Sequence, residues 1–192
     1  MNAVLRNSLQ SSIIAILLIL GTQVSGMELV DTVHDRGFSL NLTLLIRDFP
    51  EEDILMSLNE GYRSEVIFTI RTVQRRLKGL PFFNEEILME NILSITAFRD
   101  PFLGEYTMTL PQGGMATFSD PKLFLQFLGQ LTSYPLQPIP PHDPQEYQYF
   151  LQVRAEVVPI LLVPPLNLLT LFSGRYRKHT PWKTIPLVRP PQ

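Results

Sequence analysis

Apolar and polar side chains alternate along several segments of the chain, with the two-residue period of a β-strand that buries one face. The clearest example covers residues 147–157, where apolar side chains occupy every second position and the positions between them are mainly polar. The same period, or an extended run that ends at a turn signal, recurs in five further places. These predicted strands cover residues 38–46, 62–78, 86–98, 105–110 and 180–188.

Other segments have the apolar spacing of short amphipathic helices. Residues 51–59 follow Pro50 and begin with Glu51, Glu52 and Asp53, which are the residue types that a helix first turn favours. A second helix is predicted to start at Ser119-Asp120-Pro121 and to continue through Leu131, with apolar residues three or four positions apart. A third is predicted near residues 165–172.

Strict alternation joined by short connections predicts a mainly β fold, an antiparallel β-sandwich-like domain with two or three short helices. The chain has 192 residues, of which 45% are hydrophobic and 17 are proline. This size and composition indicate one folded domain with a hydrophobic core. The prolines favour short elements, and those within residues 134–144 predict a stiff surface loop.

The first 26 residues have the pattern of a secretory signal peptide. Arg6 precedes the apolar run Ile13–Leu20, and Val24-Ser25-Gly26 supplies small residues at a cleavage site. We therefore expect an exported protein of the periplasm or cell envelope whose mature domain covers residues 27–192, with an uncleaved anchor as the alternative. The absence of cysteine excludes disulfides and thiol chemistry, and it suits a bacterial envelope.

Charge is distributed unevenly between the two parts of the mature chain. Residues 27–156 contain 18 acidic and 10 basic side chains, whereas residues 157–192 contain five basic and no acidic ones. The basic, proline-rich C-terminal tail, residues 175–192, either faces an anionic partner or folds back over the acidic body. Under the first interpretation the predicted partner-binding residues are Arg175, Arg177, Lys178, Trp182 and Lys183.

No motif predicts catalytic, cofactor-binding or metal-binding residues. His142, Asp143 and Glu146 are close together, but a proline-rich loop without helix or strand spacing favours a solvated polar cluster over a metal site. The acids at 51–53 are explained by the helix first turn. Phosphate-loop, serine-elbow and dinucleotide motifs are absent, so the sequence favours a protein that is not an enzyme and needs no cofactor.

Several stretches resemble a bacterial family of exported proteins. They are the strand that ends at Arg71, the segments Leu80–Glu85 and Ile95–Tyr106, and the run Tyr149–Glu156 followed by Leu162–Leu166. In these stretches the chain resembles the DUF4390 family over residues 38–188. The resemblance implies a signal peptide and an envelope location, and it implies no enzymatic activity.

Together these features predict a non-enzymatic envelope module that binds a protein or peptide through exposed strand edges and the basic, aromatic tail. A net charge of −2 argues against a nucleic-acid partner. Two alternatives remain open at this stage. The first is a peripheral protein that uses the tail on an anionic membrane surface, and the second is a hydrolase-like or sugar-binding enzyme that uses aspartate and glutamate.

Overall fold

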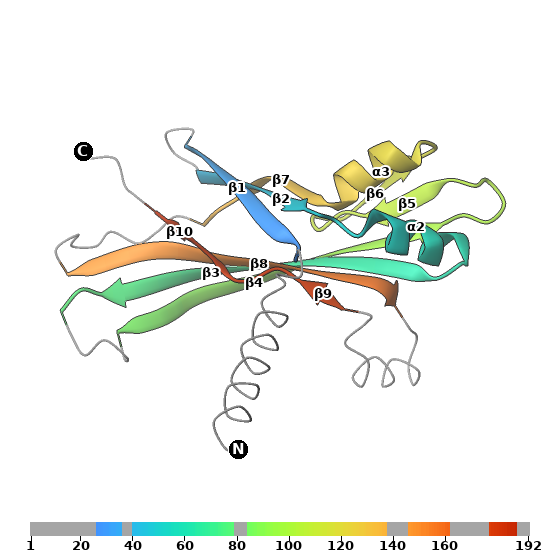
Figure 1. Ribbon diagram of the computed structural model, residues 1–192. Helices are drawn as coiled ribbons and strands as arrows, with labels where there is room; N and C mark the ends of the chain where they lie inside the picture. The colour runs from blue at the N-terminus through green and yellow to red at the C-terminus, as the bar shows by residue number, and fades with distance from the viewer. Residues whose placement is uncertain (1–25, 36–39, 79–83, 138–145, 162–176, 188–192) are drawn as a thin grey trace, which may run out of the picture.

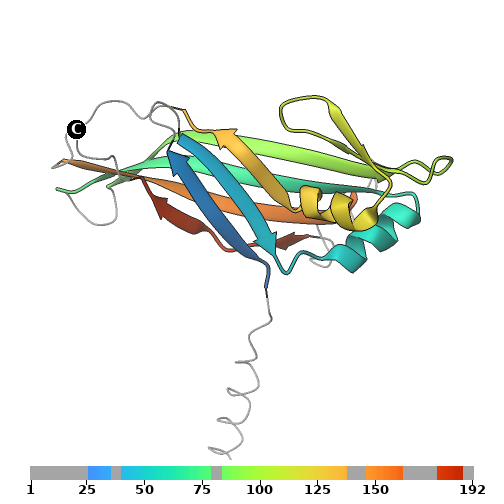
Figure 2. The same ribbon diagram turned by 90° about the horizontal axis from the view of Figure 1, so that it is seen from above.

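Two antiparallel sheets form the molecule, with two short helices beside them. The computed structural model describes residues 26–35, 40–78, 84–137, 146–161 and 177–187. The small sheet has three strands in the order β1-β2-β7, and the large sheet has the order β10-β8-β3-β4-β5-β6, with β9 also paired to β8. The small sheet and both helices cover the same face of the large sheet, and the strands of the two sheets cross obliquely (Figures 1 and 2).

The bounds of the elements show three very long strands among many short ones. In chain order they are β1 (Glu28–Asp35), β2 (Leu40–Arg47), α2 (Glu51–Asn59), β3 (Arg63–Arg76), β4 (Glu85–Arg99), β5 (Tyr106–Thr109), β6 (Met115–Phe118), α3 (Pro121–Leu128), β7 (Gln130–Pro135), β8 (Tyr147–Leu161), β9 (Lys178–His179) and β10 (Lys183–Pro186).

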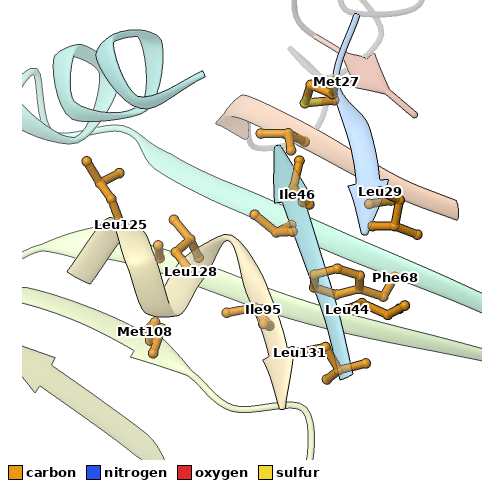
Figure 3. Close-up of a cluster of buried hydrophobic side chains, with 14 of the residues drawn as sticks. Met27, Leu29, Leu44, Ile46, Phe68, Ile95, Met108, Leu125, Leu128 and Leu131 are labelled. Carbon is orange, nitrogen blue, oxygen red and sulfur yellow. The ribbon is translucent and has the colours of Figure 1, made fainter. Parts of the chain in front are cut away.

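The hydrophobic core lies between the two sheets. Every second residue of the central strand β3 is buried from Ser64 to Ile70, and the fully buried Phe68 packs with Leu44 of the small sheet (Figure 3). Helix α3 adds Leu125 and Leu128 to the same cluster. In β3 the apolar side of the alternating pattern therefore faces the small sheet, as the sequence predicts.

Local sequence explains where the two helices begin. Asp120 caps α3, because its Oδ1 accepts a hydrogen bond of 2.9 Å from the backbone N–H of Lys122, and Pro121 fills the first turn. The first turn of α2 contains the three predicted acids. Gly61 follows α2 with a φ of +85°, a conformation that glycine adopts without steric cost.

The predicted fold class is confirmed, since the structure is mainly β, antiparallel and sandwich-like with short helices. Some predicted boundaries are wrong. Helix α3 ends at Leu128, and Leu131 lies in β7, a strand that also takes in Pro135 from the predicted loop. Strands β1 and β6 were not predicted, and β8 continues to Leu161. The helix predicted near residues 165–172 lies outside the described residues.

The failure to predict β1 has a physical cause. Its inward positions are Leu29, Asp31 and Val33, so a carboxylate interrupts the apolar alternation. Lys183 of β10 balances this charge, because its Nζ lies 2.7 Å from Asp31 Oδ1. The compensating residue comes from the far end of the chain, and no local pattern reveals it.

Candidate functional site

The cations of the C-terminal tail are paired with carboxylates of the body wherever the structure describes them. Arg177 lies 3.2 Å from Glu156 of β8, and the Nζ of Lys178 lies 2.6 Å from Oδ2 of Asp53 in α2. Lys183 pairs with Asp31 and also donates to the carbonyl oxygen of Leu29 at 2.9 Å. Arg175 lies outside the described residues. These contacts correspond to a tail that folds back over the acidic body.

Trp182, the aromatic residue of the predicted site, lies on the outer face of the large sheet. The guanidinium carbon of Arg71 is 4.3 Å from its ring centroid, and that of Arg154 is 5.9 Å away. Both distances fall within the range of cation–π attraction. Arg71 also pairs with Glu90 of β4 at 2.7 Å. The indole therefore belongs to a charged surface that spans β10, β8, β3 and β4.

Two residues that sequence reasoning missed attach the tail to β8. Thr180 is buried, its backbone N–H donates to the carbonyl oxygen of Ala155 at 2.9 Å, and its Oγ1 accepts from the N–H of Ala155 at 3.0 Å. Ile185 is 7% exposed and belongs to the core cluster. Strands β9 and β10 thus cover the margin of the large sheet at β8, and the tail is a structural part of the domain.

The opposite margin of the large sheet, at β4, is covered over a short length only. β4 pairs with β3 from Glu85 to Ala97, but β5 pairs with β4 only at Ala97, Phe98 and Arg99. Among the described residues, no strand lies beside residues 85–95 on their outer side. We call this stretch the open edge, and Figure 2 shows it along the outer margin of the sheet. Its exposed apolar side chains are Ile87, Leu88 and Ile92.

The hydrogen bonds of Thr96 reveal which backbone groups face the open edge. Its N–H donates to Oγ1 of Thr109 in β5 at 3.0 Å, and the same hydroxyl donates back to its carbonyl oxygen at 3.3 Å. Strand geometry alternates the direction of successive backbone groups. The N–H and C=O groups of Ser94, Ile92 and Glu90 therefore point outward, whereas those of Leu93 and Asn91 point toward β3.

A cavity of about 270 Å³ opens where β5 leaves β4, beside the end of the open edge. Its lining comes from four parts of the fold: β4, β5 with the following turn, α3 and β7. Most of the lining side chains are apolar, which suits an apolar side chain of a ligand. The lining residues are Ile95, Met108, Leu110, Pro111, Gln112, Gly113, Phe127, Gln130, Leu131 and Thr132.

Carboxylates surround the open edge. Arg75 neutralises Glu85 at 2.5 Å, and Arg71 neutralises Glu90. Glu65 of β3 accepts a hydrogen bond of 2.5 Å from the hydroxyl of Ser94, but it has no cationic partner among the described residues. Glu86 likewise has none within the described part of the chain. These two carboxylates lie on opposite faces of the sheet, since Glu86 is opposite Gln74, so Glu65 is the uncompensated negative charge on the outer face beside the open edge.

The remaining candidate residues do not gather into a second site in the part of the chain that is described. His142 and Asp143 lie outside it, and Glu146 accepts a hydrogen bond of 3.3 Å from Arg76. This hydrogen bond is the main cause that raises the pKa of Arg76. Within the described ranges, no group of three histidine, cysteine, aspartate or glutamate side chains is placed to hold a metal ion.

Burial raises the pKa of Tyr149, which lies near the start of β8, because an apolar environment disfavours the ionised phenolate.

None of the helices that the structure describes has the length and apolar character needed to span a bilayer.

Comparisons with known proteins return no relative for this fold. The chain matches no protein-family model, no curated protein and no solved structure. The resemblance to the DUF4390 family therefore stays a prediction from the sequence.

Proposed function

We propose that this protein is an exported, non-enzymatic module of the bacterial cell envelope that binds an extended segment of a protein partner along β4. The observation that carries this proposal is the open edge, a long stretch of strand whose outer backbone groups pair with no other strand among the described residues. Such an edge accepts another extended chain, and the new main-chain hydrogen bonds supply affinity.

The chemistry of β4 supports this role. Proteins usually protect exposed edges with proline, lysine or covering segments, since an unprotected edge pairs with other chains. β4 contains neither proline nor lysine, and although a register shift between Met89 and Ile87 marks a bulge near its start, residues 89–95 pair regularly with β3 and include Ile92, which is 66% exposed. The protein covers the opposite margin with its own tail, whereas none of the strands that the structure describes covers residues 85–95 of β4.

The state of the tail favours protein binding over attachment to an anionic membrane. Arg177, Lys178 and Lys183 are each within 3.2 Å of a carboxylate of the body, so their charges are largely neutralised. Membrane attraction needs free cations close to the lipid surface. These residues therefore contribute mainly to the fold, and the partner surface is proposed at the other margin of the sheet.

Site-specific photo-crosslinking in the native envelope tests the proposed function. A photoreactive amino acid replaces Ser94 at the open edge or, as a control, Met56 on the exposed side of α2. We expect a protein adduct from position 94 that disappears when Ile92→Pro is added, because proline removes an outward N–H. Adducts that survive Ile92→Pro, or that form equally from position 56, would contradict binding along β4.

The same preparation tests export. The intact mass of the protein recovered from the envelope fraction should correspond to a chain that begins at Met27, because Val24-Ser25-Gly26 supplies the small residues of a cleavage site. A mass that includes Met1, or recovery from the cytosol alone, would contradict this part of the proposal.

A further inference from the structure

We propose that the segment bound at the open edge is a cationic strand, with lysine or arginine on its outward positions and apolar residues on its inward positions. This inference rests on the proposed function and specifies the chemistry of the partner. Its basis is the combination of hydrogen-bond direction, the neighbouring cavity and the uncompensated carboxylate of Glu65 on the outer face.

The backbone of β4 determines which residues of an added strand point to each face of the large sheet. Glu90, Ile92 and Ser94 present outward N–H and C=O groups at every second position, as an added strand requires. The residues of the added strand then point alternately to the two faces of the large sheet. One set lies on the inner face, beside the small sheet, and the other lies on the outer face.

The inner face favours apolar side chains. Leu93 packs against the core, and Ile95 lines the cavity together with Phe127 and Leu131. A residue added opposite this part of β4 places its inward side chain next to the mouth of that cavity. An apolar side chain there removes apolar surface from water, which contributes roughly 25 cal/mol per Å².

The outer face favours positive charge. β4 contains Glu85, Glu86 and Glu90, and no basic residue occurs before Arg99 at its end. On the outer face Arg71 neutralises Glu90 and Arg75 neutralises Glu85, which leaves Glu65 of β3 without a cationic partner among the described residues. Glu86 does not contribute there, because it lies opposite Gln74 and therefore points to the inner face. A lysine or arginine of the added strand opposite Ser94 would share the outer face with the Glu65 carboxylate that Ser94 contacts, whereas an acid there would add a like charge.

The same charges disfavour a second copy of this chain as the occupant. If two β4 strands pair antiparallel about Ile92, Glu90 of one copy lies opposite Ser94 of the other. The hydroxyl of Ser94 donates to Glu65, so a second carboxylate stands beside that position. Arg71 already pairs with Glu90, and the open edge of neither copy supplies a lysine or arginine that could pair with Glu65, so a second copy lacks the cation that this face favours.

Binding of two matched peptides to the mature chain, residues 27–192, tests the proposal. Both are short and capped at their ends, and valine alternates with lysine in one and with glutamate in the other. Isothermal titration calorimetry at low salt should give a Kd about tenfold lower for the lysine peptide. Added salt should reduce this difference, since screening weakens exposed charge pairs.

Substitutions separate the contributions of charge and backbone. Glu65→Gln should remove most of the preference for lysine, whereas Glu86→Gln, which changes a carboxylate of the inner face, should leave it in place. Ile92→Pro should abolish binding of the lysine peptide, whereas Ile92→Thr, which keeps the N–H, should weaken it only severalfold. Thermal melts of each variant establish that the domain is folded.

Each contrary outcome has a distinct meaning. Equal affinity for the two peptides, with both lost on Ile92→Pro, would overturn the cationic ligand and leave the open edge as a binding site. Absence of binding by the lysine peptide would also overturn the cationic ligand. Binding that is unaffected by Ile92→Pro would overturn the proposed function itself. A dimer of the mature chain that Ile92→Pro converts to a monomer would identify a second copy as the occupant and overturn this proposal.

Discussion

The two margins of the large sheet are closed in different ways. At β8 the chain adds its own C-terminal strands, and the contact includes a buried threonine, a core isoleucine and a cross-sheet ion pair between Lys183 and Asp31. At β4 the neighbouring strand β5 covers only three residues before it turns away. In the part of the chain that the structure describes, the sheet therefore has one margin built into the core and one that is open along most of its length.

This difference shows that strand length alone does not decide whether an edge is closed. β4 and β8 have 15 residues each, and both pair with β3 along most of their length. Closure depends on a further segment whose side chains reach the core, as Ile185 does. A margin without such a segment keeps its hydrogen-bonding groups available to another chain.

Proline substitution at adjacent positions of β4 should separate its paired side from its open side. Leu93→Pro removes an N–H that points toward β3 and should lower the free energy of unfolding by about 3 kcal/mol, because a ladder bond is lost and its acceptor is left unpaired. Ile92→Pro should change it by less than about 1 kcal/mol, since proline is tolerated on the open side of an edge strand.

Urea-induced unfolding of the mature chain measures both values. Equal destabilisation by the two prolines would show that the outward direction assigned to the backbone of Ile92 is wrong.

Truncation of the tail side chain that enters the core tests the closed margin. Ile185→Ala should destabilise the domain by about 2 kcal/mol, because it removes buried apolar atoms near the boundary of the core, where neighbours can partly collapse into the space. Thr184→Ala, at an exposed position of the same strand, should cost less than about 0.5 kcal/mol. Similar small losses for both would mean that β10 does not seal the sheet in solution.

The smallest expected effect concerns the turn that joins β4 to β5. Oδ1 of Asp100 accepts hydrogen bonds from the N–H groups of Leu103 at 3.0 Å and Phe102 at 2.8 Å, which lower the pKa of this carboxyl. Because the folded-state pKa lies below the unfolded one, the stabilisation is present above the unfolded pKa and is lost as pH falls through the folded pKa.

An NMR titration should therefore show the amide signals of Phe102 and Leu103 shifting with a midpoint below the ordinary aspartate value. Asp100→Asn should abolish this acid-range transition while the rest of the spectrum is retained. A midpoint at the ordinary value would show that the turn does not hold the carboxylate.

The sequence predicts those parts of the fold whose pattern is local. Alternation identifies β3 and β8, and acids after a proline identify α2, because each signal lies within one element. Leu131 continues the three-to-four spacing of α3 by coincidence, since Gly129 ends the helix and the next residues pair with β2. β6, with four residues, is too short to establish a period.

The candidate site is less predictable because it depends on contacts between distant residues. The excess of positive charge in the tail is visible in the sequence, but its pairing is not, since Lys178 and Asp53 are 125 positions apart. The open edge of β4 exists because the neighbouring strand β5 stops after four residues. The sequence of β4 itself carries one local indication of an exposed apolar edge, since Ile87-Leu88-Met89 and Ile92-Leu93 place apolar residues on both faces of the strand.

The order of synthesis gives the closed margin a further consequence. β10 follows β8 in the chain, so β8 emerges, from the ribosome or in the proposed export from the membrane, before the segment that closes it, and Lys183 meets Leu29 and Asp31 only after most of the domain has emerged. Until then the nascent sheet has two unpaired margins and is prone to associate with other nascent chains. The last strand to be synthesised therefore also ends the period in which self-association competes with folding.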